Sequence, residues 1–248
     1  WVSQTGGIYE SRGVKTTPYA YPTPFSTPEV LINGSDCNVG DIDDNFVFES
    51  NVYDKISIVC TDGASSLKMK TTYNHGYSWG LLKEIHNTGA STMENISVSL
   101  VDHRVYITYT LAGNNNEVFF IESIDDGETF SSAVEVGDDI LEGQGLGNGG
   151  LVTGLNDRRA NLFYIANLDL SNNIVFSEGI PTEEPLTGDN WTFPNINATI
   201  THSYCQTNGC EPRVRDNVAI DNEKIYFLYE EQSSAISEAL WVAVTGIK

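Results

Sequence analysis

The chain has 248 residues, 40% of them hydrophobic, so it can bury a core as one large domain or two small ones. Its 34 acidic residues outnumber its 13 lysines and arginines, which gives a formal net charge of −21 and a pI near 4.3. A surface this acidic repels nucleic acids and anionic lipids, and no apolar run is long enough to span a bilayer. Neither a nucleic-acid partner nor membrane insertion is therefore predicted.

The N-terminal region is the least regular part of the chain. Residues 1–23 carry several prolines and are predicted to form an irregular arm that lies on an edge. Residues 25–32 alternate as a strand does. From residue 45 onward, apolar and polar residues alternate with a period of two between turns rich in Gly, Asn and Asp, and helical periodicity is almost absent. The sequence therefore predicts an all-β chain.

The alternating segments form a repeat of about fifty to sixty residues, and each unit contains four predicted strands. The last unit lacks its fourth strand, and residues 25–32 resemble the fourth strands of the other units. The strands are predicted at residues 45–48, 55–59, 67–71 and 79–85, then 95–100, 104–109, 117–122 and 130–136, then 150–153, 161–165, 173–176 and 191–196, and finally 216–220, 224–229 and 239–244.

Two turns at the same point of the repeat share the spacing Ser/Thr-x-Asp/Asn-x-Gly-x-Ser/Thr-aromatic. They are residues 72–79 and residues 123–130. In this pattern the acid or amide accepts backbone N–H bonds, the glycine takes a positive φ, and the aromatic side chain packs under the turn. The defining positions are Asn74, Gly76 and Trp79 in the first copy and Asp125, Gly127 and Phe130 in the second.

This spacing resembles the Asp-box of sialidase-like β-propellers. The resemblance implies one domain over residues 1–248, a small propeller of four blades with four antiparallel strands each. Residues 25–32 would complete the fourth blade and so close the ring. A fifth blade would require residues 1–23 to form more strand than their pattern predicts. The Asp-box is a folding device and says little about chemistry. Arg12 lacks the Arg-Ile-Pro motif of sialidases, so sialidase activity is not expected.

A propeller brings the starts of its innermost strands together at one mouth of a central channel. Oxygen ligands converging there suit a hard cation such as calcium or a bound ligand. Paired carboxylates there also suit glycoside hydrolysis, in which Asp44, Glu94 and Glu211 would act. The third interpretation is that these residues bond local backbone in turns. The predicted site consists of Asp43, Asp44, Glu94, Asn148, Glu211 and Arg213.

The four cysteines are even in number and lack the spacing of a zinc site. Cys205 and Cys210 flank a short loop with a glycine turn, which leaves Cys37 to pair with Cys60. Two disulfides indicate an oxidising compartment and hence secretion. Four sequons would carry sugar if the source organism glycosylates; they are Asn33, Asn95, Asn190 and Asn197.

Because no complete catalytic constellation emerges, the leading hypothesis is a secreted, non-catalytic protein that binds a glycan or a protein. It requires no cofactor, although calcium can stabilise the acidic channel mouth. One alternative is a glycoside hydrolase or lyase acting through the channel-mouth carboxylates. Another is a structural subunit that assembles into oligomers or filaments through residues 1–23.

Overall fold

The computed structural model describes the following parts of the chain: 8–10, 29–37, 46–50, 55–62, 64–101, 103–111, 118–136, 150–153, 160–168, 171–181, 191–192, 198–199, 211–221, 224–233 and 236–246. Every regular element in these residues is a β-strand, and every pair of neighbouring strands is antiparallel. The predicted all-β class is therefore confirmed.

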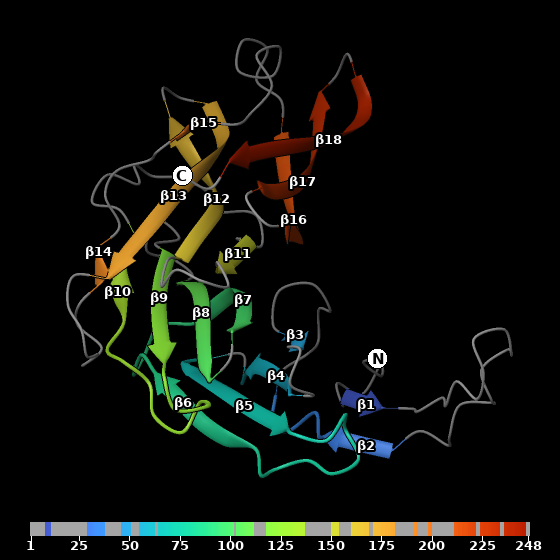
Figure 1. Ribbon diagram of the computed structural model, residues 1–248, viewed down its shortest axis with the longest axis vertical. Coiled ribbons are helices and arrows are strands. Elements are labelled where there is room, and N and C mark those ends of the chain that lie inside the picture. The colour runs from blue at the N-terminus through green and yellow to red at the C-terminus, as the bar shows by residue number, and fades with distance from the viewer. Residues whose placement is uncertain are drawn as a thin grey trace, which may run out of the picture.

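The strands form a series of sheets that follow one another along the chain (Figure 1). A two-stranded sheet contains β1 (Ile8–Glu10) and β2 (Glu29–Ile32). The first four-stranded sheet is β3 (Phe46–Ser50), β4 (Ile56–Thr61), β5 (Ser66–Thr72) and β6 (Lys83–Asn87). The second is β7 (Met93–Val101), β8 (Arg104–Leu111), β9 (Val118–Ser123) and β10 (Val134–Glu135). The third is β11 (Gly150–Thr153), β12 (Ala160–Leu168), β13 (Ser171–Pro181) and β14 (Trp191–Thr192), with β15 (Ala198–Thr199) also paired to β13. The last is β16 (Glu211–Asp221), β17 (Lys224–Ser233) and β18 (Ile236–Gly246).

These sheets confirm the repeat. Each predicted strand of the four units has a counterpart within a few residues, and the last unit has three strands as predicted. The first strand of each sheet also contacts the first strand of the next, as β3 contacts β7, β7 contacts β11 and β11 contacts β16. Repeated antiparallel sheets with neighbouring first strands are how a β-propeller is built. The blade count stays a prediction.

The N-terminal strand is described in part, as β2. In the part of the chain that the structure describes, β2 pairs with β1, whereas β18 pairs with β17. The predicted closure of the ring by residues 25–32 beside β18 is therefore not confirmed, and residues 8–10, within the arm predicted to be irregular, form a strand. The reason is burial: Ile8 and Ile32 pack against Ile58 of β4 in an apolar cluster that neighbours the first sheet.

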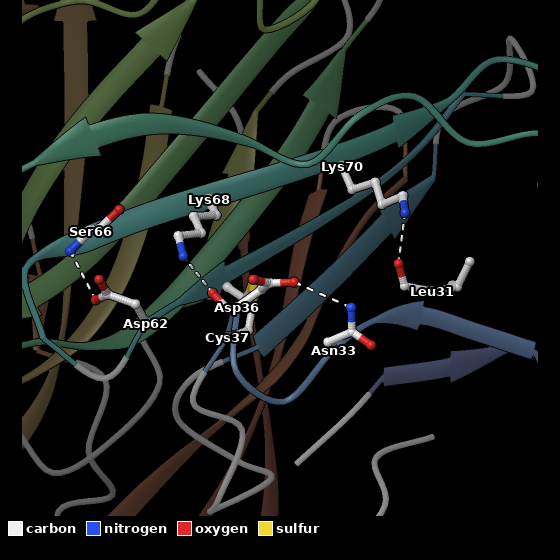
Figure 2. Close-up of a disulfide and its surroundings, with 9 residues drawn as sticks. Leu31, Asn33, Asp36, Cys37, Asp62, Ser66, Lys68 and Lys70 are labelled. Atoms are coloured by element: carbon white, nitrogen blue, oxygen red, sulfur yellow. Dashed lines mark hydrogen bonds between the residues drawn. A yellow bond between two sulfur atoms is a disulfide. The ribbon is translucent and has the colours of Figure 1, made fainter.

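A disulfide fixes this N-terminal sheet to the first four-stranded sheet (Figure 2). Cys37 follows β2, Cys60 lies in β4, and both are fully buried with their Cα atoms 5.9 Å apart. The pairing of Cys37 with Cys60 is thus confirmed. It closes a loop of 23 residues and so restricts the unfolded chain. The predicted partners Cys205 and Cys210 lie outside the described residues.

Two lysines of β5 bond the same N-terminal segment. Lys68 donates to the carbonyl oxygen of Asp36 at 2.7 Å, and Lys70 donates to that of Leu31 at 2.6 Å (Figure 2). Since side chains alternate along a strand, the residue between them, Met69, points to the other face of β5. That face packs against the second four-stranded sheet.

The main core lies between the first two four-stranded sheets. Its buried residues are Val59, Leu67 and Met69 from the first sheet and Met93, Ile96, Val98, Leu100, Val105, Ile107, Tyr109, Leu111 and Ile121 from the second.

A hydrogen bond between two neutral side chains joins the same two sheets. The Tyr109 hydroxyl and His86 Nε2 are 2.8 Å apart. Burial raises the pKa of Tyr109 and lowers that of His86.

The two motif turns have the same hydrogen-bond network. The Thr72 hydroxyl donates to Asn74 Oδ1 and accepts from the Gly76 N–H, at 2.8 and 3.1 Å; Ser123 does the same with Asp125 and Gly127, at 2.8 and 2.7 Å. In each turn the acid or amide oxygen also accepts a backbone N–H four residues later, at 2.9 Å. The predicted local geometry of both turns is therefore confirmed.

The third position of the turn accepts either Asn or Asp, because the hydroxyl four residues later can accept a hydrogen bond from the amide or donate one to the carboxylate. In the first turn, Asn74 Nδ2 donates to the Ser78 hydroxyl at 2.9 Å. In the second, the Thr129 hydroxyl donates to Asp125 Oδ2 at 2.6 Å. A hydroxyl group can donate or accept, so either partner is satisfied.

The aromatic residue of each motif lies where the pattern predicts. Trp79 is partly buried against the apolar cluster around the disulfide, and Phe130 is partly buried against the main core. Two residues in each turn adopt a positive φ: 55° at His75 and 80° at Gly76, then 63° at Asp126 and 84° at Gly127. Only glycine takes this conformation without steric cost.

Replacing Gly127 by alanine is expected to reduce the free energy of unfolding by about 2–3 kcal/mol. The positive φ accounts for about 1 kcal/mol, and the new Cβ would also overlap the Met69 Cε in the buried core. Gly89→Ala is the matched control, because Gly89 has a φ of 82° and no atom lies within 4 Å of its added Cβ. Urea unfolding followed by tryptophan fluorescence measures both. Equal losses in the two variants would show that the contact with Met69 is unimportant.

Candidate functional site

A surface groove of 340 Å³ lies where the first four-stranded sheet meets the turn 123–130 of the second. We call it the junction groove. One wall comes from β5, the start of β6 and the segment between them, and the other comes from the turn. Its lining combines apolar, aromatic and charged side chains: Met69, Thr71, Tyr73, Gly80, Leu81, Lys83, Asp126 and Glu128.

An ion pair across the two sheets forms the inner part of the site. Lys55, directly before β4, is 2% exposed, and its Nζ donates to Asp126 Oδ1 at 2.9 Å. The same Nζ lies 5.8 Å from the centre of the Tyr73 ring. A buried ammonium group is stable only when it is paired and hydrogen-bonded. Asp126 therefore has a structural role, because its carboxylate neutralises the charge of Lys55.

Asp126 is held from several directions. Its second carboxylate oxygen is 2.8 Å from His103 Nδ1, and its own N–H donates to the His103 carbonyl oxygen at 2.8 Å. Burial acts to raise the pKa of Asp126, but the hydrogen bonds and charges of Lys55 and His103 outweigh it, so the pKa lies below its ordinary value. The carboxylate is ionised at neutral pH and serves the groove as an acceptor.

The outer part of the groove is open to solvent. Tyr73 is 55% exposed and Leu81 is 91% exposed. Lys83 and Glu128 face each other with Nζ and Oε2 at 3.2 Å, and Glu128 is 72% exposed. An exposed pair of this kind contributes little to stability, so both groups are available to a ligand.

The hydroxyl of Tyr73 stays protonated in this setting. Partial burial raises its pKa, and the negative charges of Asp126, Glu128 and Asp125 raise it further. The hydroxyl also lies 3.4 Å from the Asp126 carbonyl oxygen. Tyr73 therefore offers a ligand an aromatic face and a neutral hydroxyl, both within a region of negative potential.

The two neighbouring acids of the second turn, Asp125 and Asp126, are held in the ionised form. Hydrolysis by two carboxyl groups needs one whose pKa is raised, so that it can donate a proton. The hydrogen bonds of Asp125 and Asp126 instead hold their pKa values low, against a burial effect that acts to raise them. The carboxylate of Asp126 in the groove is therefore an acceptor of hydrogen bonds and is not poised to donate a proton.

The structure places part of the predicted channel-mouth site. Glu94 lies near the start of β7, opposite Thr110, and Glu211 begins β16, opposite Gln232. Arg213 lies two residues further along, and both strands shift register shortly after these positions. Because β11 contacts both β7 and β16, the two strands flank a shared neighbour. Asp43, Asp44 and Asn148 lie outside the described residues.

In the part of the chain that the structure describes, a group of three or more His, Cys, Asp or Glu side chains arranged for a metal does not occur. The acidic positions for which calcium was predicted include residues outside that part. The same described residues contain no helix long and apolar enough to cross a membrane.

Sequence analysis did not identify the junction groove. Its key side chains, Tyr73, Asp126 and Glu128, occupy the variable x positions of the two turns, which the motif leaves unspecified. One signal was present. Lys55 directly precedes the mostly apolar strand 56–61, and a lysine that is buried with such a strand requires a charge partner.

The comparisons with known proteins support a fold and no more. No protein-family model and no curated protein sequence matches this chain. Among solved structures, a protein of unknown function from Dyadobacter fermentans matches with 14% identity and a TM-score of 0.54, over 81% of this chain and 52% of that one. At that identity the likeness shows a shared fold alone, and this chain spans about half of that protein.

Two further solved structures superpose less closely. One is a thermostable family-43 glycoside hydrolase, with 14% identity and a TM-score of 0.48 over 82% of this chain and 69% of that chain. The other is an alpha-L-arabinofuranosidase from Lactobacillus brevis, with 11% identity and a TM-score of 0.47 over 88% of this chain and 78% of that one.

The two neighbouring acids of the second turn are expected to differ in their effect on stability. Asp126→Asn removes the carboxylate that pairs with the buried Lys55 and should reduce the free energy of unfolding by about 2–3 kcal/mol. Asp125→Asn should cost about 1 kcal/mol or less, because Asn74 fills the same place in the first turn. Chemical denaturation at neutral pH measures both. Similar losses would show that Lys55 does not depend on Asp126.

The same pair predicts how stability depends on pH. The folded-state pKa values of Asp125 and Asp126 lie below their unfolded values, so their contribution is present above about pH 4. It is lost as the pH falls through the folded-state values. The wild-type protein should therefore lose stability in acid more steeply than Asp126→Asn does.

Proposed function

We propose that this protein is an extracellular carbohydrate-binding protein and that its ligand occupies the junction groove. The observation that carries the proposal is the exposed face of Tyr73, which lies between apolar side chains and ionised carboxylates in one concave surface. Small-ligand sites are typically concave and largely apolar, with a few polar groups that fix orientation.

The chemistry of a sugar ring matches these groups. The apolar face of a pyranose can stack on the Tyr73 ring, as apolar groups do on aromatic side chains. Its hydroxyl groups can donate to the carboxylates of Asp126 and Glu128. The net charge of −21 disfavours sulfated or uronic-acid polymers, so neutral and cationic glycans are the expected class.

The extracellular location rests on the disulfide and on one sequon. The bond between Cys37 and Cys60 is stable in an oxidising compartment. Asn33, an exposed residue directly after β2, is a sequon position that an attached glycan can reach. The other three sequon asparagines have no described side chain.

Replacing Tyr73 by alanine is expected to weaken glycan binding by about threefold to tenfold, because the stacking surface is lost. Tyr77→Ala is the matched control, since Tyr77 is 68% exposed in the same turn but does not line the groove. A glycan array identifies the ligand, and titration calorimetry compares the variants. Equal weakening by both changes, or an array without any ligand, would contradict the proposal.

A second candidate is a glycoside hydrolase that uses Asp44, Glu94 and Glu211. It is favoured by the positions of Glu94, the second residue of β7, and Glu211, the first residue of β16, since both precede a shift of register. Two carboxyl groups brought together from different sheets could serve as acid and base or nucleophile. This candidate places the reaction on the side of the first strands, away from Tyr73.

Under this second candidate, Glu211→Gln is expected to abolish turnover of chromogenic glycosides while leaving the midpoint of urea unfolding unchanged. The amide keeps the shape of the side chain but can neither donate nor accept the proton. Glu29→Gln changes the net charge equally at an exposed position of β2 and should retain full activity. If the wild-type protein hydrolyses none of the substrates, the hydrolase candidate is excluded for that panel.

A further inference from the structure

Tyr73 already binds one ammonium group on its inner side. The Nζ of Lys55 lies between the Asp126 carboxylate, at 2.9 Å, and the Tyr73 ring, at 5.8 Å from its centre. Attraction between a cation and the face of an aromatic ring adds to the charge–charge attraction with the carboxylate. Tyr73 and Asp126 together therefore already accommodate one ammonium group, that of Lys55.

The outer side of the same cluster presents the same two kinds of group to solvent. The Tyr73 ring is 55% exposed, Asp126 is 30% exposed and Glu128 is 72% exposed. We propose that the junction groove recognises an ammonium group on its glycan, as carried by a glucosamine unit. This inference rests on the proposed function, because it takes the glycan to lie in the groove, and it adds the class of glycan.

The charge around the groove favours such a ligand. Three carboxylates, those of Asp125, Asp126 and Glu128, act on the Tyr73 hydroxyl, whereas two lysines lie at the site, Lys83 in the lining and Lys55 buried behind it. The bridge between Lys83 and Glu128 is exposed and therefore weak, so a ligand ammonium can take the place of Lys83 at the carboxylate. The overall charge of −21 would also speed the approach of a cationic chain.

Asp126 keeps room for this second cation. Lys55 and His103 each occupy one carboxylate oxygen, but a carboxylate has about four acceptor positions in total. An additional ammonium group can therefore approach from the groove without displacing Lys55. The exposed apolar side chain of Leu81 on the opposite wall would contact the ring carbons of the sugar.

Two oligosaccharides that differ only in acetylation test the inference. The probes are the β-1,4-linked hexamers of glucosamine and of N-acetylglucosamine, titrated into the wild-type protein by calorimetry at low salt and at a pH that protonates the amine. The glucosamine hexamer should bind about fivefold more tightly or better, and added salt should reduce the difference. Equal affinity, or tighter binding of the acetylated hexamer, overturns the inference and leaves the proposed function standing.

Absence of binding by both hexamers overturns the inference as well. The proposed function is judged separately, by whether any glycan on the array binds in a manner that depends on Tyr73. The two failures are therefore distinguishable.

Variants locate the preference in the groove. Glu128→Gln should reduce the preference for the glucosamine hexamer by about threefold to fivefold, because it removes an exposed charge and keeps the shape. Glu29→Gln removes the same amount of negative charge from the protein at a position that does not line the groove. Tyr73→Phe should retain most of the preference, since the ring remains. If Glu29→Gln reduces the preference as much as Glu128→Gln, the effect comes from the overall charge and the inference is overturned.

Discussion

The ion pair between Lys55 and Asp126 is the constraint on which the junction of the first two four-stranded sheets depends. Transfer of an ammonium group from water to a buried position costs several kcal/mol, and the partner's charge has to offset that cost. Asp126 reaches Lys55 from a backbone conformation with a φ of 63°, which costs a non-glycine residue about 1–2 kcal/mol. The ion pair therefore helps to offset the cost of the positive φ at Asp126.

The turn supplies the rigidity that this contact needs. A hydroxyl and a carboxylate inside the turn bond its own backbone, so the conformation is stable before any neighbour is contacted. The first turn has the same internal bonds and the same positive φ, but places His75 where the second places Asp126. The motif therefore separates two tasks. Its specified positions build the turn, and its variable positions determine what the turn contacts.

This separation explains how much could be predicted from the sequence. The strands followed from alternation, because side chains of a strand point to opposite faces, and the two turns followed from the spacing of Ser, Asp and Gly. The pairing of Cys37 with Cys60 followed from the count of cysteines. The place of β2 could not be predicted in the same way. Alternation identifies a strand but not its partner, and the partner was decided by the burial of Ile8 and Ile32 beside the disulfide.

The junction groove escaped prediction for a related reason. Its walls come from segments about fifty residues apart, and its side chains occupy positions that the repeat leaves free to vary. Comparison of the repeated units identifies the residues that all units have in common. A binding site between two units depends instead on the residues that differ from one unit to the next. Tyr73 has Ile124 as its counterpart in the second turn, and Asp126 has His75 in the first. Since the backbone is the same in both turns, these side chains alone make the junction a groove that is aromatic on one wall and acidic on the other. A site of this kind can change its ligand by substitution at the variable positions without altering the fold that holds it.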